Sequence, residues 1–421
     1  MRESRLRFKN EYGDNYPNWE EKSLGEIGRF QTSSVDKLVR ENEDQVYIVN
    51  YMNVYNHDKI TKNSLYKLQK VTAKKTQIIS NDLKKGDILF TPSSETRDDI
   101  GHSVVVFEDL NNCVYSYHLI RFRPNTNLDI LYSHYFCNNN KVLSQIVKLS
   151  TGSTRFTVSL KSFSTIEVSF PDIEEQEKIG NFFTLLDKNL ELQEAKLEEL
   201  KKYKKGIMKK LFSQEIRFKD ENGNNYSDWE EKKLGEIGIS YNGLTGKKKD
   251  DFGEGKAYIT YKQIFDNSKI DISKFEFVKI TEIDNQNNVK YGDVLFTTSS
   301  ETPNEVGYSS VMLDDIDEVY LNSFSFGYRI KNFKVLLPNF AKYFFRSSEL
   351  RNEIIKLAQG STRFNMSKTK FMEIVVLLPI FFEQQKIANF LSSIDNRIEK
   401  EKEKLKELKK MKKGLLQKMF V

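Results

Sequence analysis

Two polar motifs occur twice in this chain and contain the residue types best suited to binding chemistry. The sequence GSTRF stands at residues 152–156 and again at 360–364, and the sequence SSET stands at 93–96 and 299–302. Hydroxyls, a carboxylate and a guanidinium can hydrogen-bond to a polar ligand, and the same groups can hold a loop in shape. Both interpretations stay open at this point, and the duplication itself requires an explanation.

Catalytic and nucleotide-binding motifs do not accompany these loops. The stretch GLTGKKKD at 243–250 has the wrong glycine spacing for a phosphate-binding loop, and FGEGK at 252–256 is typical of a plain loop. No GxSxG, HExxH or paired-carboxylate arrangement recurs in both copies, and the Asn/Asp-Pro-Pro-aromatic motif of base methyltransferases is missing. The sequence therefore predicts a non-catalytic chain, although an unrecognised active site stays an alternative because catalytic residues need not be neighbours in sequence.

Metal and disulfide chemistry are not indicated either. The four histidines are scattered, and the two cysteines, Cys113 and Cys137, form no CxxC pair. This pattern predicts no metal, no cofactor in this chain and a reducing compartment. The opening MRESRLRFKN has no apolar core, and no apolar run reaches membrane-spanning length, so we expect a cytoplasmic protein with no membrane partner.

The chain is long enough for at least two globular units and is only mildly basic. It has 421 residues, of which 30% are charged and 12% aromatic, and its net charge is +6. A small positive excess permits a nucleic-acid partner without requiring one, because local basic patches matter more than the sum.

Most of the sequence is an internal duplication with an offset of about 208 residues. Residues 7–28 match residues 217–238 at 16 of 22 positions, and both tryptophans, Trp19 and Trp229, fall on equivalent positions. The segments EEQEKIGNFF at 174–183 and FEQQKIANFL at 382–391 also correspond. The middles, 35–80 and 98–150 against 245–288 and 304–358, align poorly. A repeated scaffold with divergent faces is expected if the two copies read different targets.

Each copy has the pattern of a mixed α/β domain. Strands are predicted at 47–54, 257–265, 88–90, 294–296 and 320–330, and a helix is predicted at 339–360. Further strands are predicted at 164–170 and 372–378, each ending at a proline, Pro171 or Pro379. Trp19 and Trp229 are expected to be core anchors.

Two long helices are predicted after the repeated domains. Residues 174–212 contain no proline, and an apolar stripe with a step of three, four or seven runs along this segment and its repeat. Asp172 and Glu175 resemble a capping box for the first helix, which the second helix lacks. A helix of this length spans about 58 Å, so we expect the stripes to bury each other in an antiparallel pair, with packing on each stripe's own domain as the alternative. The stripe residues are Phe183, Leu186, Leu190, Leu197, Leu200 and Ile207, with Leu391, Ile394, Ile398, Leu405, Leu408 and Leu415.

Together these motifs resemble the specificity subunits of Type I restriction–modification systems. The features that carry the resemblance are the GSTRF loop, the strand closing at proline and the Glu-Gln-x-Lys-Ile start of a long helix, all present twice, together with the opening WEEKKLGEIG. The resemblance implies an α/β (α+β) fold with two similar target recognition domains, separated by two antiparallel coiled-coil helices. It predicts recognition domains at 1–171 and 217–379 and spacer helices at 172–216 and 380–421.

The resemblance also implies a function and partners. Each recognition domain would read one half of a bipartite, gapped site in double-stranded DNA, and the helices would set the gap. The partners would be two modification subunits that carry S-adenosylmethionine for adenine-N6 methylation, and restriction subunits that carry ATP and Mg²⁺ for cleavage. The chain itself would hold no cofactor.

Candidate DNA contacts fall into a shared group and a divergent group. Contacts to phosphate position a protein on DNA, whereas contacts to bases specify the sequence. The identical loops are therefore expected either to position the protein on DNA or to hold the fold together, and the divergent middles are expected to distinguish bases. The carboxylates of Glu95 and Glu301 could accept from cytosine N4. The shared candidates are Ser93, Ser94, Glu95, Thr96, Ser153, Thr154 and Arg155, with Ser299, Ser300, Glu301, Thr302, Ser361, Thr362 and Arg363. The divergent candidates are Tyr51, Asn53, Lys62, Lys74, Lys75, Arg97, His118 and Arg121, with Lys247, Lys248, Tyr261, Lys262, Gln263, Asn304, Ser325 and Tyr328.

A non-catalytic scaffold that joins two protein partners through its coiled coil is the main alternative. Such a scaffold would not need the polar and basic loop residues that both middles contain. A nuclease with an unrecognised site is the second alternative, and metal-dependent cutting of DNA by the purified chain would support it.

Overall fold

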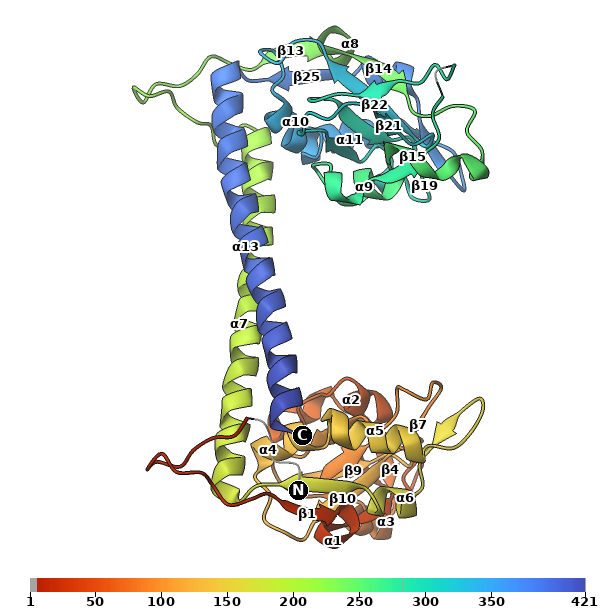
Figure 1. Cartoon of the computed structure of the whole chain (residues 1–421), viewed down its shortest axis with the longest axis vertical. Helices are drawn as coiled ribbons and strands as arrows, with labels where there is room; N and C mark the ends of the chain where they lie inside the picture. Colours follow the sequence, from red (N-terminus) through yellow and green to blue (C-terminus); the bar gives the residue numbers. More distant parts are fainter. Residues whose placement is uncertain (1–5, 282, 421) are drawn as a thin grey trace. The chain divides into compact units, whose positions relative to one another are not determined.

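The computed structural model describes residues 6–281 and 283–420, which fall into two compact units (Figure 1). Unit 1 comprises Met1–Glu194 and Glu403–Val421, and unit 2 comprises Ala195–Lys402. The helices α7 (Ile173–Phe212) and α13 (Phe381–Met419) each begin in one unit and end in the other. Each unit is therefore one repeated domain, the start of its own long helix and the end of the other copy's helix.

Unit 1 contains two four-stranded sheets. The first has the order β2-β10-β6-β8 with antiparallel neighbours, and the second has the order β4-β3-β9-β5, in which β3 and β9 are parallel. Two small pairs, β1 with β12 and β7 with β11, complete the strands. The strands are β1 (Glu20–Ser23), β2 (Gly28–Thr32), β3 (Asp44–Val49), β4 (Gln69–Ala73), β5 (Asp82–Leu83), β6 (Ile88–Phe90), β7 (Ser93–Ser94), β8 (Ser103–Val105), β9 (Leu110–Tyr115), β10 (Ile120–Pro124), β11 (Phe156–Thr157) and β12 (Glu167–Phe170). The shorter helices are α1 (Leu24–Ile27), α2 (Tyr51–Tyr55), η1 (Lys62–Lys67), α3 (Lys75–Ser80), α4 (Ile130–Phe136), α5 (Asn140–Leu149) and α6 (Leu160–Ser164).

Unit 2 repeats this topology. Its sheets have the orders β14-β22-β18-β20 and β16-β15-β21-β17, with β15 and β21 parallel, and β13 pairs with β25. The strands are β13 (Glu230–Lys233), β14 (Gly238–Asn242), β15 (Phe252–Ile259), β16 (Glu276–Val278), β17 (Asn288–Val289), β18 (Val294–Thr297), β19 (Ser299–Ser300), β20 (Ser309–Val311), β21 (Val319–Leu321), β22 (Ser325–Ile330), β23 (Ala358–Gln359), β24 (Phe364–Met366) and β25 (Val375–Leu378). The helices are α8 (Leu234–Ile237), η2 (Lys249–Asp251), α9 (Tyr261–Asp266), η3 (Ile272–Lys274), η4 (Pro303–Glu305), α10 (Pro338–Phe344), α11 (Ser348–Ile355) and α12 (Lys368–Met372). The predicted mixed α/β class and the internal repeat are confirmed.

Four predicted elements are wrong in their extent. The segments 47–54 and 257–265 are each a strand followed by a helix, because polar caps end the strand: the Asn50 N–H donates to Asn53 Oδ1 (2.9 Å), and Thr260 Oγ1 accepts from the Gln263 N–H (3.3 Å). The segment 320–330 is two strands in different sheets, since Asn322 turns the chain between them. The predicted helix at 339–360 is two helices, and Ser347 caps the second.

The end of each long helix enters the core of the domain from the other copy. In unit 1, Phe420 lies 5.5 Å from Tyr132 of α4 and 6.1 Å from Phe183 of α7, measured between ring centroids. In unit 2, Phe212 lies 5.6 Å from Phe340 of α10. These aromatic contacts are repeated because the sequence that makes them is repeated.

The helix segments within each unit are antiparallel, as predicted. In unit 1, Asp187 pairs with Lys412 and Glu194 with Lys409 (2.6 Å). In unit 2, Lys196 pairs with Glu401 (2.5 Å) and Lys204 with Asp395 (2.5 Å). Phe183, Leu186, Leu190, Leu197, Leu391, Ile394 and Ile398 of the predicted stripe are buried, and Leu200, Ile207, Leu405, Leu408 and Leu415 are half-buried. Leu408 and Leu415 also pack against the core of unit 1, so the stripe contacts both a partner helix and a domain.

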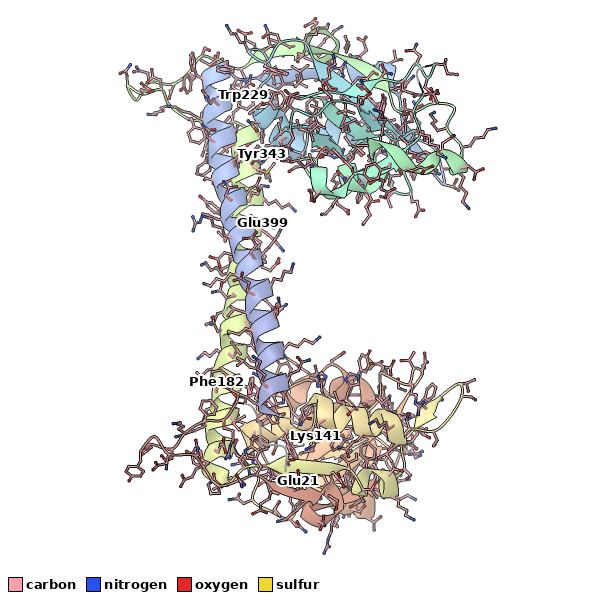
Figure 2. All side chains as sticks on the ribbon, in the orientation of Figure 1. Glu21, Lys141, Phe182, Trp229, Tyr343 and Glu399 are labelled. Carbon is pink, nitrogen blue, oxygen red and sulfur yellow. The ribbon has the colours of Figure 1, made fainter. Side chains whose placement is uncertain are left out.

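A tyrosine joins each of these helix pairs to its domain. Tyr135 of α4 donates to Asp187 (2.8 Å), and the equivalent Tyr343 of α10, labelled in Figure 2, donates to Asp395 (2.7 Å). The ammonium of Lys204 lies 5.3 Å from the Tyr343 ring centroid. Asp187 and Asp395 thus each accept a hydrogen bond from a tyrosine of their own domain and form an ion pair with a lysine on the long helix of the other copy.

A buried glutamate holds the first segment of each copy to the start of its long helix. The Glu175 side chain is 0% exposed, and it accepts from Arg7 Nη2 (2.6 Å) and from the Trp19 indole N–H (3.2 Å). Glu383 likewise accepts from Arg217 Nη2 (2.7 Å) and the Trp229 indole (3.2 Å). The Glu-Gln-x-Lys-Ile motif is therefore a structural clasp.

The neighbouring motif residues complete this clasp. Gln176 donates to Pro171 O (2.8 Å) and accepts from the Asp129 N–H (3.0 Å). Lys178 donates to Lys9 O (2.9 Å). The Glu175 N–H donates to Asp172 Oδ1 (3.0 Å), which is one half of the predicted capping box. The other half is replaced, because the Glu175 carboxylate binds Arg7 and Trp19.

Along residues 6–281 and 283–420, no helix is both long enough and apolar enough to cross a membrane.

Replacing Arg217 by alanine is expected to destabilise unit 2 by about 3 kcal/mol or more, because it leaves the Glu383 carboxylate buried without its ionic partner. In a Trp19→Phe background Trp229 is the single tryptophan, so its fluorescence during urea unfolding reports on unit 2. Lys402→Ala is the control, since its pair with Glu399 (3.2 Å) is exposed and should contribute less than about 1 kcal/mol. Equal losses from the two variants would contradict the clasp.

A histidine in unit 1 makes that unit sensitive to acid. His134 of α4 lies against Phe107 and Tyr135, and burial lowers its pKa from 6.5 to about 4. Between these two pKa values the unfolded chain binds a proton that folded unit 1 does not bind, so this contribution to stability is lost as pH falls from 6.5 to 4. The equivalent position in unit 2 is Lys342, whose ammonium lies 3.3 Å from Asp395.

His134→Phe is therefore expected to reduce the loss of stability of unit 1 on acidification. The measurement is urea unfolding of both proteins at pH 7 and pH 5, with Trp19 as the reporter in a Trp229→Phe background. The difference in unfolding free energy between parent and variant should shift in favour of the variant at pH 5. A difference that stays constant between the two pH values would contradict the assignment.

Candidate nucleic-acid interface

The two repeated polar motifs lie next to each other in each unit. In unit 1 they form the antiparallel pair β7–β11, which places Phe156 opposite Ser94 and Thr157 opposite Ser93. In unit 2, β19 and β24 place Phe364 opposite Ser300. The GSTRF and SSET loops thus form one continuous surface, although about 60 residues separate them in sequence.

The glycine that opens GSTRF is required by the backbone. Gly152 has φ of +131° and Gly360 has φ of +137°, and an added Cβ would lie 2.1 Å from the carbonyl oxygen of Arg155 or Arg363. An L side chain at either position would collide with this carbonyl. The turn leaves Ser153, Thr154 and Arg155 exposed, together with Ser361, Thr362 and Arg363.

An aromatic helix residue holds the SSET strand from the other side. Tyr51 of α2 donates from its hydroxyl to Ser93 O (3.1 Å), and Tyr261 of α9 donates to Ser299 O (2.7 Å). Arg155 Nη2 donates to Ser93 Oγ (3.1 Å). The shared loops are therefore clasped to the fold, while their tips stay open to a ligand.

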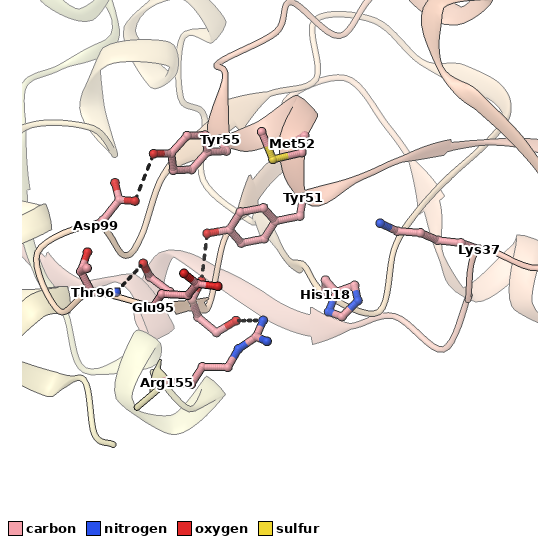
Figure 3. Close-up of a pocket in the computed structure, with 11 residues that line it drawn as sticks. Lys37, Tyr51, Met52, Tyr55, Glu95, Thr96, Asp99, His118 and Arg155 are labelled. Atoms are coloured by element: carbon pink, nitrogen blue, oxygen red, sulfur yellow. Dashed lines mark hydrogen bonds between the residues drawn. The ribbon is translucent and has the colours of Figure 1, made fainter. Parts of the chain in front are cut away.

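These residues surround an open pocket of about 530 Å³ in unit 1 (Figure 3). Seven predicted residues line it, which are Tyr51, Ser93, Ser94, Glu95, Thr96, His118 and Arg155. The pocket is polar and mixed in charge, with exposed Glu95 and Arg155 at its edge. Its hydrogen-bonding groups suit the edge of a base or a phosphate oxygen.

Four further lining residues were not predicted, namely Lys37, Met52, Tyr55 and Asp99. Tyr55 stacks on Tyr51 at 6.0 Å between ring centroids and donates to Asp99 Oδ2 (3.1 Å). A spacing of four residues puts Tyr51 and Tyr55 on one helix face. If the sequence predicted a helix at this segment instead of a strand, Tyr51 and Tyr55 would be expected side by side at the site.

Several predicted contact residues are buried or half-buried in the fold, where most of them bind other groups of the protein. Arg121 is 5% exposed and binds Asp82 (3.0 Å), and Tyr328 is 0% exposed and donates to Leu234 O (2.7 Å). Gln263 donates to Lys274 O, and Lys247 pairs with Asp284 (2.6 Å). Ser94, Ser299, Ser300 and Ser325 are also buried.

The remaining divergent candidates of unit 1 do not line this pocket, and those of unit 2 lie in the other domain. Asn53 caps α2 and donates to Asp58 (2.9 Å), and Arg97 donates to Val147 O (3.3 Å). Lys62, Lys74, Lys75, Lys248, Lys262 and Asn304 are exposed on the surface. The residues that belong together are thus the repeated loops, Tyr51 or Tyr261, and the turn that carries His118.

The fold and this repeated surface place the chain among proteins built from two copies of one domain. The family described as the Type I restriction modification DNA specificity domain matches residues 16–202 and 226–410. The chain belongs to this family and is a DNA sequence-specificity subunit; subunits of this kind are non-catalytic.

Two relatives from Methanocaldococcus jannaschii illustrate the family. The chain is 27% identical over 317 residues to the Type I restriction enzyme MjaVIII specificity subunit, covering 68% of this chain and 69% of the relative. It is 30% identical over 223 residues to the putative MjaX specificity subunit, covering 51% and 50%.

Solved structures share the fold at low identity. The S subunit of a Type I restriction–modification system from M. genitalium matches with a TM-score of 0.52 and 16% identity, covering 100% of this chain and 99% of that one. The HsdS subunit from Thermoanaerobacter tengcongensis matches with a TM-score of 0.55 and 16% identity, covering 97% of each chain. The predicted fold class is confirmed.

Gly152→Ala is expected to open the GSTRF turn of unit 1, because the methyl group cannot occupy the space of the Arg155 carbonyl. Amide hydrogen exchange at Thr157, whose N–H donates to Thr151 O (2.8 Å), should become faster. Gly206→Ala is the control, since no atom lies within 4 Å of its added Cβ and helix propensity favours alanine by about 1 kcal/mol. Unchanged exchange at Thr157 would show that the turn does not need glycine.

Proposed function

We propose that each unit reads one half of a bipartite, gapped site in double-stranded DNA through the surface of its GSTRF and SSET loops. The observation that carries this proposal is the repetition of that surface. Both units keep the same glycine turn, the same arginine and the same tyrosine-to-serine hydrogen bond, while the residues beside them differ. Two domains that read different sequences in the same polymer need shared contacts that position them and different contacts to the bases.

The charges on this surface support a nucleic-acid ligand. Arg155 and Arg363 are exposed and can bind a phosphate or the O6 and N7 edge of guanine, and Glu95 and Glu301 can accept from the exocyclic amine of cytosine. Each pair consists of a donor and an acceptor on adjacent loops, so one surface can both position a duplex and inspect a base pair.

The long helices supply the proposed spacing. α7 and α13 are continuous over 40 and 39 residues, and ion pairs fix their register within each unit. We propose that their length sets the gap between the half-sites. The antiparallel helix pair also offers repeated surfaces to two copies of one modification subunit.

The proposed complex carries its chemistry on the partners. Modification subunits would hold S-adenosylmethionine and methylate adenine N6, and restriction subunits would hold ATP and Mg²⁺. This chain would select the site in a cytoplasmic assembly.

Deletion of the gene for this chain is expected to remove one bipartite, gapped motif from the map of N6-methyladenine in its host's genome. Restoring the gene on a plasmid should restore the same motif, and a copy lacking residues 217–379 should not. Loss of this motif after deletion of the modification subunit as well would tie the two together. A methylation map that does not change on deletion, in cells where the modification subunit is expressed, would contradict the proposal.

A further inference from the structure

Equivalent positions in the two units can be matched through their strands. Phe90 and Phe296 occupy the same place in the repeated sequence, and they face Ile120 and Phe326 across the sheet. Counting back two residues from these partners gives His118 in unit 1 and Phe324 in unit 2. The repeat therefore places an imidazole and a phenyl ring at the same turn.

Both rings lie beside the GSTRF arginine of their unit. His118 and Arg155 line the same pocket (Figure 3). In unit 2 the guanidinium carbon of Arg363 lies 5.7 Å from the Phe324 ring centroid. The turn and the shared loop thus meet in each unit, and the residue at the turn is the part that differs.

The walls of the two sites differ in the same sense. In unit 1, Asp99 accepts from Tyr55, and His102 Nε2 lies 2.9 Å from it. In unit 2, Phe265 takes the place of Tyr55 and has no hydroxyl. Its ring packs at a tilt against Tyr308, with 4.9 Å between the ring centroids. Unit 1 is therefore the more polar site, and unit 2 is the more aromatic one.

The two rings offer different chemistry to a base. Burial and the nearby charges of Lys37 and Arg155 lower the pKa of His118, so near neutral pH its ring is uncharged, with one N–H donor and one acceptor nitrogen. Phe324 has no polar side-chain atom and is 58% exposed, although phenyl rings are usually buried. An exposed phenyl ring held by a basic loop fits an apolar group on an otherwise charged ligand.

We propose that His118 and Phe324 are the matched base-discriminating residues of the two units. His118 hydrogen-bonds to a base edge in the half-site read by unit 1, and Phe324 packs on the C5-methyl group of a thymine in the half-site read by unit 2. In the major groove this methyl group is the apolar feature that distinguishes thymine. This inference rests on the proposed function. It adds which residue of each unit contacts a base and which chemical group of the DNA that residue contacts.

The thymine contact is tested on the unmodified protein. The complex of this chain with its modification subunit is titrated with synthetic duplexes that contain its methylated motif, and each thymine is replaced in turn by uracil, which lacks only the methyl group. One replacement in the half-site of unit 2 should weaken binding about fourfold, the value for burying one methyl group. Phe324→Ala should bind the thymine and uracil duplexes equally.

The role of His118 is tested by measuring which bases the complex prefers. The His118→Phe complex is titrated with duplexes in which each base pair of the unit 1 half-site is replaced, and discrimination at one position should fall by about fivefold or more. Preference in the other half-site should stay as in the parent. Phe277→His, at an exposed phenylalanine outside the matched turn, is the control and should change no position.

The outcomes separate this inference from the function on which it rests. Equal binding of the parent complex to its motif and to a scrambled duplex would reject DNA reading altogether. Specific binding by the parent, with no effect of uracil at any thymine or with no thymine in that half-site, would reject the role of Phe324. A uniform loss of affinity across all duplexes in His118→Phe, with base preferences unchanged, would reject the role of His118.

Discussion

The buried carboxylate at the start of each long helix is the interaction on which the rest of each unit depends. Glu175 and Glu383 are 0% exposed, and an ionised carboxylate in such a place requires a cation and donors. The guanidinium and the indole N–H come from the first segment of the copy, so satisfying this charge ties the beginning of the domain to the beginning of its helix. The strand that precedes the helix, the glutamine beside the carboxylate and the loop before α4 or α10 are held by the same short stretch of sequence.

This arrangement explains which parts of the repeat are constant. The clasp, the glycine turn and the tyrosine-to-serine hydrogen bond each require particular atoms at particular places, and all three are present in both units. Residues that only face the pocket are under no such geometric requirement. The change from His118 to Phe324, or from Tyr55 to Phe265, leaves the sheet and its helices intact and alters only what the surface offers to a ligand.

A long and repeated physical pattern is the feature that the sequence predicts best. An apolar stripe of about seven turns has few alternative explanations, and both helices begin within two residues of the predicted positions. Short segments are harder to predict, because Tyr51 and Tyr55 belong to a five-residue helix whose pattern resembles a strand, and the hydrogen bond from the Asn50 N–H to Asn53 Oδ1 marks the start of that helix. Arg121 shows the other limit: two of its guanidinium nitrogens bind Asp82 and Gln31, which are distant in sequence, whereas residue type alone suggests an exposed cation.

The repeat itself was the most informative feature, since it acts as a comparison within one chain. A residue that stays the same in both copies but has no ligand-facing atoms, such as Trp19 and Trp229, is explained by packing and hydrogen bonding inside the fold. A residue that changes at a matched, accessible position has no such explanation, because the fold tolerates both versions. The turn with His118 and Phe324 is a position of this kind, and it lies beside an arginine that both units share. A difference in the bases that the two units read is therefore better explained by this turn than by the exposed lysines, which are scattered over the surface.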